Sequence, residues 1–401
     1  MAEIEYREYR SEDAASFLRL HDSAFPKMSA DFWREFSSHD VTAAVAILDG
    51  EVVGTVPFQF RDFRVRQDMT VRVAWEFSVC VREDLRGTGV GSSLMTIAKE
   101  FLRGRCVAMA VYRNDETSAA YRYYARNGHR DLLYMRPWSL SGGGCIAGAD
   151  VSTRSWEDFL GHEAEYLDLF AAAYRLYGGF PQRYPGYYAR AVRTSEYDEI
   201  PVDLSILECR DSSGALSGYA IIGIEQDSPT QHLMEIAVRG NDATLAQSLL
   251  AGFVQTAAGR GLSAVISIAD SSPVMSLLPA LGFDPKSRDE SSMVIMAHIV
   301  DPDAFVQRVW RESERTRNLD VVAWTPQREA FLHRADGDGS RRVILEMKED
   351  ALTRLLFGRL DLVIAFRQGT VTAPGDGAME IAAISDALPF SVWTYHYLDF
   401  V

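Results

Sequence analysis

Three glycines at alternate positions mark the most restrictive stretch of this sequence. The segment Arg86–Ser92 reads Arg-Gly-Thr-Gly-Val-Gly-Ser and lies between the β-rich run Thr70–Val81 and the segment Ser92–Leu102, whose apolar residues recur at helical spacing. Glycines leave the backbone N–H groups of such a turn unobstructed, and the following helix adds free N–H groups and the positive end of its dipole. A strand, this turn and a helix in succession predict an anion site, best suited to a phosphate or pyrophosphate.

The spacing of the glycines distinguishes between kinds of phosphate loop. A Rossmann fingerprint needs Gly-x-Gly-x-x-Gly in the first βα turn, and a P-loop needs Gly-Lys followed by Ser or Thr. Neither pattern is present in this stretch. Arg86, Gly89 and Gly91 instead satisfy the pattern of Gln or Arg, two residues, Gly, one residue, and Gly or Ala. That pattern resembles the pyrophosphate loop of the GNAT acetyltransferases. The alternative is that the glycines serve only the geometry of the turn.

A tyrosine-rich helix supplies the second landmark. The segment Ser118–Arg126 is predicted to be a helix that Asn127-Gly128 closes as a C-cap. GNAT enzymes commonly have a Tyr four residues before Gly-Phe, and Tyr124 precedes Gly128-His129 by that spacing. The resemblance makes Tyr124 the general acid, because the departing CoA thiolate must be protonated and a phenol of pKa about 10 can supply the proton. The alternative is a half-buried aromatic residue on a helix face, and Tyr123 is the second choice for the acid.

The order of predicted elements recurs once along the chain. Strand end Val81 corresponds to Val238, an offset of 157 residues, and helix end Gly128 corresponds to Gly282, an offset of 154. Two nearly equal offsets indicate an internal duplication. The second copy lacks the Gly-x-Gly turn and has Leu278 in place of the candidate acid. The first unit is therefore predicted to be catalytic, and the second to be a degenerate copy kept for packing or for a pocket wall.

Alternating strand and helix patterns predict an α/β (α+β) fold. Val41–Leu48 and Glu51–Phe58 flank Asp49-Gly50, which is a strong hairpin signal. Ser139–Asp150 is rich in glycine and reads as a linker, and a different pattern begins after Ile299. We expect two tandem GNAT-fold units with mixed sheets at residues 1–140 and 151–295, followed by a smaller α/β unit at 296–401. The elements expected in the second unit are strands at Ala215–Glu225, His232–Val238, Leu262–Ile268 and Met293–Ile299, and helices at Ala243–Ala258 and Ser272–Leu281.

An active GNAT unit, a degenerate one and a tail unit together resemble the Eis (enhanced intracellular survival) family of acetyl-CoA-dependent N-acetyltransferases. The resemblance extends over the whole chain in architecture and implies a sterol-carrier-protein-like third unit. Because that family modifies aminoglycosides and other amines, the implied acceptor is a small-molecule primary amine, and the implied assembly is a homo-hexamer. The residues that would bind acetyl-CoA are Val79, Cys80 and Val81 along the pantetheine arm, Arg86, Gly87, Thr88, Gly89, Val90, Gly91 and Ser92 at the pyrophosphate, and Ala119 and Ala120 on the helix before Tyr124.

The resemblance also implies roles for the two ends of the chain. The family places its terminal carboxylate in the active site as the base, which here is the α-carboxylate of Val401, and burial would raise its pKa above about 3.5. Phe400 precedes this terminal Val. The alternative is that the aromatic C-terminal tail only docks the third unit and has no catalytic role. Near the N-terminus, Asp22, Phe32 and Trp33 are candidates for the acceptor pocket, since an acid beside aromatic rings suits a cationic amine. The alternative is that these three residues are ordinary surface and core residues with no part in binding the acceptor.

Composition narrows the classes of partner. Asp and Glu number 56 against 41 Lys and Arg, and the net charge of −15 argues against nucleic acid. The N-terminus has no apolar signal region, and no apolar stretch approaches the roughly 18–20 residues of a membrane span, so a cytoplasmic protein is expected. The eight His and four Cys show no metal-ligand spacing, so no metal is expected. A lipid carrier built on the third unit and a non-catalytic protein that senses acyl-CoA are the other functions left open.

Overall fold

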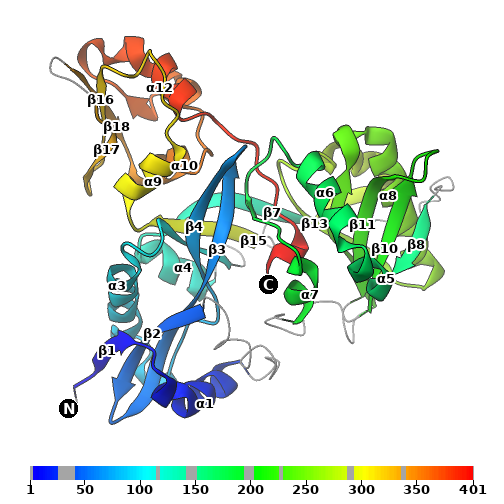
Figure 1. Ribbon diagram of the computed structural model, residues 1–401. Coiled ribbons are helices and arrows are strands. Elements are labelled where there is room, and N and C mark those ends of the chain that lie inside the picture. Colours follow the sequence, from blue (N-terminus) through cyan, green and yellow to red (C-terminus); the bar gives the residue numbers. More distant parts are fainter. Residues whose placement is uncertain are drawn as a thin grey trace.

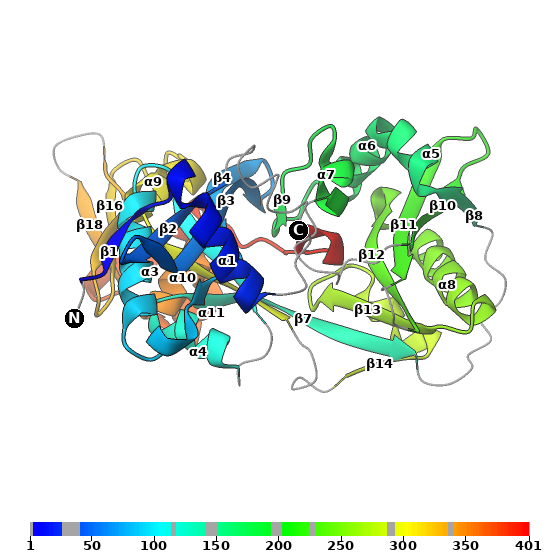
Figure 2. The same ribbon diagram turned by 90° about the horizontal axis from the view of Figure 1, so that it is seen from below.

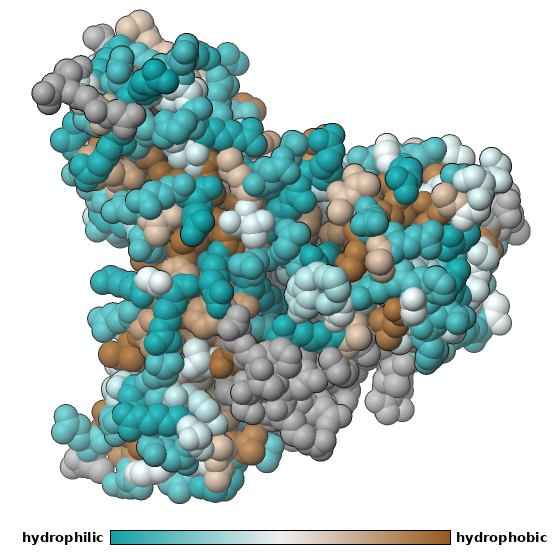
Figure 3. All heavy atoms as spheres, viewed as in Figure 1, coloured by the Kyte–Doolittle hydropathy of each residue, from teal (hydrophilic) through white to brown (hydrophobic). Residues whose placement is uncertain are grey.

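A long mixed sheet crosses the middle of the molecule in the computed structural model, which describes residues 3–25, 41–113, 118–140, 151–193, 203–224, 229–286, 293–335 and 340–400. Within these residues the main path of the sheet has the order β1-β2-β3-β4-β6-β15-β7-β13-β12-β11-β10-β8. Two groups of helices cover it, and a smaller sheet with its own helices forms a third lobe (Figure 1). On the face seen in Figure 3, hydrophilic residues cover most of each lobe. We call residues 3–140, 151–286 and 301–400 the first, second and third units.

The first unit places helices on both faces of its strands. The predicted hairpin is confirmed: β2 and β3 join through Asp49 and Gly50, which both have positive φ as this turn requires. Apolar residues of α3 pack on one face of these strands, and those of α1 pack on the other. The elements are β1 (Glu5–Glu8), α1 (Ala14–Ala24), β2 (Val41–Leu48), β3 (Glu51–Arg66), β4 (Met69–Glu76), β5 (Cys80–Val81), α3 (Val90–Leu102), β6 (Ala108–Arg113), α4 (Ala119–Arg126) and β7 (Arg130–Leu140).

The second unit repeats this order of strands and helices. The predicted helix Ser272–Leu281 is instead two short 3-10 turns, η4 (Met275–Leu277) and η5 (Pro279–Leu281), because Pro279 has no N–H to continue a helical ladder. Gly282 follows in the left-handed region and ends this stretch. The remaining elements are β8 (Ser152–Ser155), α5 (Trp156–Gly161), α6 (Glu163–Ala173), β9 (Phe180–Pro181), α7 (Tyr187–Arg193), β10 (Asp203–Arg210), β11 (Leu216–Ile224), β12 (Thr230–Val238), α8 (Ala243–Gly259), β13 (Ser263–Ala269) and β14 (Phe283–Pro285).

The two units exchange strands. β15 (Met293–Ile299), which the sequence pattern places at the close of the second unit, lies between β6 and β7 of the first and pairs with both. β7 in turn extends to β13, with Ile266 opposite Trp138, and Figure 2 shows β7 bridging the two lobes. Backbone hydrogen bonds therefore run without a break from one unit into the other, so we expect them to behave as one rigid frame.

The third unit packs on the face of the sheet opposite α3. Its strands have the order β17-β16-β18-β19. Arg66, at the end of β3, is buried and donates to the carbonyls of Val309, Leu355 and Leu356 at 2.8–3.1 Å; burial lowers its pKa to about 9. This contact ties the third unit to the first. The elements are α9 (Pro302–Val309), β16 (Leu319–Trp324), β17 (Glu329–His333), β18 (Arg341–Met347), α10 (Glu349–Leu356), α11 (Leu362–Arg367), β19 (Val371–Thr372) and α12 (Ile381–Ala387).

The C-terminal segment leaves the third unit and ends between the other two as the short helix η7 (Tyr397–Phe400) (Figure 1). Gly178 of the second unit is the point where three segments meet, since an added Cβ would lie 2.3 Å from the Val65 carbonyl oxygen and 2.9 Å from Nε1 of Trp393. Trp393 itself donates to that Val65 carbonyl at 2.9 Å. The fold therefore brings the end of the chain against β3 of the first unit.

Candidate active site

The strand that precedes the glycine turn separates from its neighbour. β4 pairs with β6 only from Val73 to Trp75, whose partner is Ala110. The backbone is then irregular, with Ser78 at positive φ, before β5 resumes pairing with β3 alone. In the described residues no pairing joins β5 to the end of β6, so the sheet opens there. On this side β5 pairs with no strand of the described residues, and a free strand edge of this kind can pair with an extended ligand.

The predicted anion loop lies at one end of this opening. Gly89 is the N-cap of α3 with φ +97°, and a Cβ there would meet no atom within 4 Å, so the turn faces open space. Gly91 is constrained by packing, because a Cβ would lie 3.2 Å from Cε2 of Tyr123. Nε of Arg86 donates to the Val81 carbonyl at 3.1 Å and so holds the loop to β5. The first N–H groups of α3 have no partner within the helix and point toward any anion in this turn.

Tyr124 lies beside the end of β6. It is on α4, only 1% of its surface is exposed, and Nη2 of Arg113 donates to its hydroxyl oxygen at 3.0 Å. The same guanidinium is 4.8 Å from the ring centroid. Arg113 is the last residue of β6, the strand that separates from β5. The Tyr124 hydroxyl oxygen therefore accepts a charge-assisted hydrogen bond from the end of the strand that separates from β5.

The neighbouring tyrosines have other roles. The Tyr123 hydroxyl donates to the Gly91 carbonyl at 2.8 Å, and burial raises its pKa well above the usual value. The Tyr121 hydroxyl donates to the Asp131 carboxylate at 2.9 Å. Tyr123 therefore supports the glycine loop, whereas the hydroxyl of Tyr124 is bound by an arginine at the opening. This geometry favours Tyr124 over Tyr123 as the acid.

A buried polar cluster fixes the ring of Tyr124 from beneath. His129 and Glu76 are both buried and joined at 2.6 Å, and the His129 ring packs edge-on against Tyr124 with centroids 5.1 Å apart. Nζ of Lys99 donates to the Asn127 carbonyl close by, and burial lowers its pKa. The sequence pattern missed this cluster, although His129 in place of the usual Phe is a signal that could have found it, since a polar residue in an apolar motif needs a buried partner.

On the opposite face, Cys80 of the predicted pantetheine strand lies in a second buried group. Nε2 of His21 is 2.8 Å from the Thr55 hydroxyl oxygen and 3.9 Å from Sγ of Cys80. Burial raises the pKa of the Cys80 thiol to about 11 and lowers that of His21 to about 3. Both groups are therefore neutral near pH 7, and Cys80 is a free, buried cysteine in a small apolar environment.

His21 makes stability depend on pH. Its pKa is about 3 in the folded chain and about 6.5 in the unfolded chain, so the unfolded state binds the extra proton between these values. The contribution of neutral His21 to the free energy of unfolding is therefore complete above about pH 6.5. It is lost progressively as the pH falls below that value. Between pH 7 and 5 we expect a loss of about 2 kcal/mol from this residue. The free energy of unfolding of wild type and His21→Asn can be measured with urea at several pH values. We expect this free energy to depend less steeply on pH in the variant, and an equal pH dependence would contradict the assignment.

The other predicted site residues are distributed as follows. Ala119 and Ala120 are exposed on the first turn of α4, and Asp22 is exposed near the end of α1. Phe32, Trp33 and Val401 lie outside the described residues. In the part of the chain that the structure covers, no three His, Cys, Asp or Glu residues are grouped to hold a metal ion, and no helix has the length and apolar character of a membrane span.

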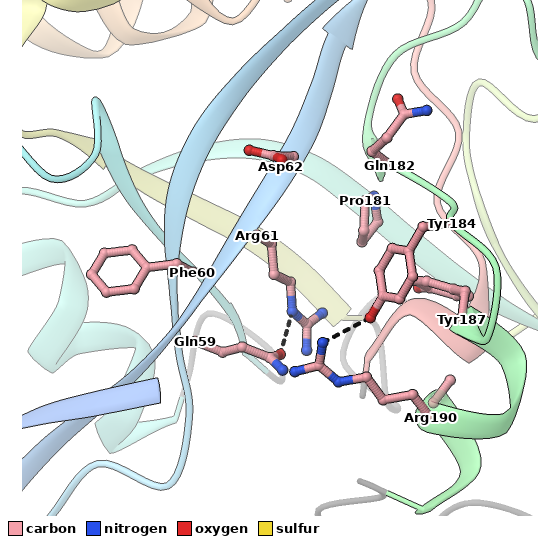
Figure 4. A pocket seen from close by; sticks show the side chains of 10 residues that line it. Gln59, Phe60, Arg61, Asp62, Pro181, Gln182, Tyr184, Tyr187 and Arg190 are labelled. Carbon is pink, nitrogen blue, oxygen red and sulfur yellow. Dashed lines mark hydrogen bonds between the residues drawn. The ribbon is translucent and has the colours of Figure 1, made fainter. Parts of the chain in front are cut away.

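The C-terminal segment reaches the edge of this region. Nη1 of Arg61 on β3 donates to the Asp399 carbonyl at 3.0 Å, and the Tyr395 ring stacks on Trp75 with centroids 5.9 Å apart. Trp75 is the residue at which the pairing of β4 with β6 stops. Beside Arg61 is a pocket between β3 and the second unit (Figure 4). Sequence reasoning did not find Arg61, because no motif marks it.

Comparison with known proteins supports the fold described above. Residues 4–129 match the acetyltransferase (GNAT) family, and a search of curated proteins finds no match. Solved structures similar to the whole chain include a probable N-acyltransferase of unknown function from Enterococcus faecalis (TM-score 0.72, 14% identity, 99% of this chain and 100% of that one). A GCN5-related N-acetyltransferase from Anabaena variabilis gives a TM-score of 0.71 at 13% identity over 98% and 99% of the two chains. Eis1 from Mycobacterium abscessus gives 0.60 at 14% identity over 97% of each. At these identities the likeness shows the fold.

Proposed function

We propose that this chain, whose first unit is an acetyltransferase domain of the GNAT family, transfers the acetyl group of acetyl-CoA to a small-molecule primary amine. The observation that supports the proposal is the opening between β5 and β6, with the glycine turn of Gly89 after β5 and the Tyr124 hydroxyl beside the end of β6. A pyrophosphate at the loop and a pantetheine arm along β5 would bring a thioester into this opening.

The reaction is a direct attack. The amine nitrogen forms a bond to the thioester carbonyl carbon, and the bond from that carbon to sulfur breaks. The CoA thiolate takes the proton of Tyr124, and the surplus proton of the amine passes to a base. We assign the base to the α-carboxylate of Val401, in support of which Asp399, two residues before it, is held against Arg61 of the first unit.

The second and third units have supporting roles in this proposal. In the second unit, Val238-Arg239-Gly240-Asn241 occupies the position of the anion loop, with no Gly-x-Gly turn. We assign to the third unit a sterol-carrier-protein-like fold that delivers the end of the chain to the site. A homo-hexamer and a cytoplasmic location stay predictions from the resemblance.

The proposal is tested by incubating the purified chain with acetyl-CoA and a panel of primary amines, and measuring free CoA and acetylated product by mass spectrometry. We expect product and CoA in equal amounts, well above hydrolysis without amine. Binding of acetyl-CoA with no product from any amine would favour the acyl-CoA sensor. If the chain does not bind acetyl-CoA, both the acetyltransferase and the acyl-CoA sensor are excluded, and the lipid carrier is left.

A further inference from the structure

A pocket of about 260 Å³ lies between β3 of the first unit and α7 of the second. Its lining combines polar and charged side chains with apolar ones, and two of the charged side chains are arginines (Figure 4). Typical pockets for drug-sized ligands measure roughly 300–1,000 Å³, so this one suits a small molecule. The lining residues are Gln59, Arg61, Gln182, Tyr184, Tyr187 and Arg190, together with Phe60, Asp62, Pro181 and Ala191.

Arg61 has a positive charge that no carboxylate of the described residues pairs with. Its Nε donates to Oε1 of Gln59 at 2.6 Å and its Nη1 to the Asp399 carbonyl at 3.0 Å, so both acceptors are neutral oxygens. The guanidinium lies 5.3 Å from the centroid of the Trp75 ring, which fixes its plane. Since neighbouring strand residues point to opposite faces, the Asp62 carboxylate is directed away from it (Figure 4).

Arg190 extends toward the same space from α7. Its Nη1 donates to the Tyr184 hydroxyl oxygen at 2.7 Å, and in Figure 4 its guanidinium and that of Arg61 approach each other from the two units. Two guanidiniums that face the same space present N–H donors, and these donors match the oxygens of a carboxylate or a phosphate.

Two buried carboxylates near this pocket, those of Glu235 and Asp399, are already paired. Arg183 is buried between Glu235 and Asp399, and the Tyr187 hydroxyl donates to the Asp399 carboxylate at 2.9 Å. Among the described residues, Arg61 is therefore left with neutral acceptors, and Asp62 is the acidic residue of the pocket lining. In a chain with a net charge of −15, a guanidinium bound only by neutral oxygens in a pocket is a local preference for an anion.

The pocket is next to the place where acetyl transfer would occur. Gln59 of its lining pairs across β3 and β4 with Trp75, and Trp75 is the last residue of β4 that pairs with β6. The opening for the thioester therefore begins one strand away from the pocket wall. A small molecule bound by Arg61 can present a second group toward that opening.

We propose that this pocket binds the acceptor, and that the acceptor is a small primary amine that also carries an oxyanion, either a carboxylate or a phosphate. The proposal rests on the acetyltransferase function above and names its substrate class. Arg61 holds the oxyanion, and the amine forms the amide while CoA leaves as the thiol. This class differs from the polycationic acceptor that the resemblance implies, whose charge Arg61 would repel.

The test uses pairs of amines that differ by the anionic group alone. Lysine and cadaverine, ornithine and putrescine, and tyrosine and tyramine differ by a carboxylate; glucosamine 6-phosphate and glucosamine differ by a phosphate. We expect kcat/KM for the anionic member of at least one kind of pair to exceed that of its partner by about tenfold or more. Arg61→Gln should collapse this ratio, whereas Arg260→Gln should not, because Arg260 is an exposed residue of the second unit paired with Asp203.

A second readout is independent of acetyl transfer. Calorimetric titration with glutarate and with inorganic phosphate should show binding to wild type and Arg260→Gln and a loss in Arg61→Gln. Equal kcat/KM within every pair, with active enzyme, would overturn the substrate class but not the acetyltransferase function. Anion binding seen only in a chain that lacks Val401 would also overturn it, because Arg61 would then serve the chain's own carboxylate. If no amine is acetylated, the acetyltransferase proposal fails, and anion binding lost in Arg61→Gln would still show the oxyanion site.

Discussion

Gly89→Trp is expected to abolish the binding of acetyl-CoA. Gly89 has φ +97° and no atom within 4 Å of the position of a Cβ, so an indole there would project into the space that the pyrophosphate needs. It would also force an L side chain into the left-handed region at the N-cap of α3. Loss of two hydrogen bonds to a charged group corresponds to roughly a hundredfold or more in affinity. Calorimetric titration with acetyl-CoA measures this effect, and wild type should bind one molecule per chain.

The second unit offers a matched control for this variant. Gly240 occupies the corresponding turn, with φ +64° and likewise no atom within 4 Å of a Cβ. Gly240→Trp introduces the same bulk and the same backbone strain, so it should leave affinity and stoichiometry as in wild type. Two molecules of acetyl-CoA per wild-type chain, or a loss of binding in Gly240→Trp, would show that the second unit is not degenerate.

The elements that depend on local sequence could be predicted, whereas their pairing could not. Asp49-Gly50 specifies a hairpin turn by its backbone preference, and Gly128 ends α4 in the left-handed conformation. The position of β15 depends on contacts between residues far apart: Met293–Ile299 is an apolar strand that fits a buried sheet in either unit. Nothing in its pattern indicates that it lies between β6 and β7.

The same distinction applies to the site. The sequence makes the glycine loop and Tyr124 candidates because each belongs to a short motif with a fixed spacing. Arg113, Glu76 and Arg61 belong to three different strands, and each has a place in the proposed site only through a partner that the fold brings to it. A single charged residue in a β-rich run is ordinary in any sequence, so only the folded chain distinguishes these three.

Tyr124→Phe is expected to reduce kcat by about a hundredfold to ten-thousandfold, the range attributed to general acid catalysis. The change removes one hydroxyl from a side chain that is 1% exposed and leaves the packing of the ring against His129 in place. The thiolate would then have to leave without a proton donor. Because the hydroxyl contacts Arg113 rather than the glycine loop, acetyl-CoA should bind as tightly as in wild type. Steady-state kinetics and calorimetry on the same preparation separate these two effects.

The neighbouring helix position gives the control. Tyr121→Phe also removes one hydroxyl from α4, but that hydroxyl donates to Asp131, so kcat should stay close to the wild-type value. If Tyr124→Phe kept more than about a third of the wild-type kcat, another group would have to protonate the thiolate. If the variant lost affinity for acetyl-CoA by the same factor as it lost kcat, the role of Tyr124 would be to shape the opening that binds the cofactor. A loss in kcat alone, confined to Tyr124→Phe, is the result that a proton donor requires, because the acid acts in the chemical step and not in the binding of the thioester.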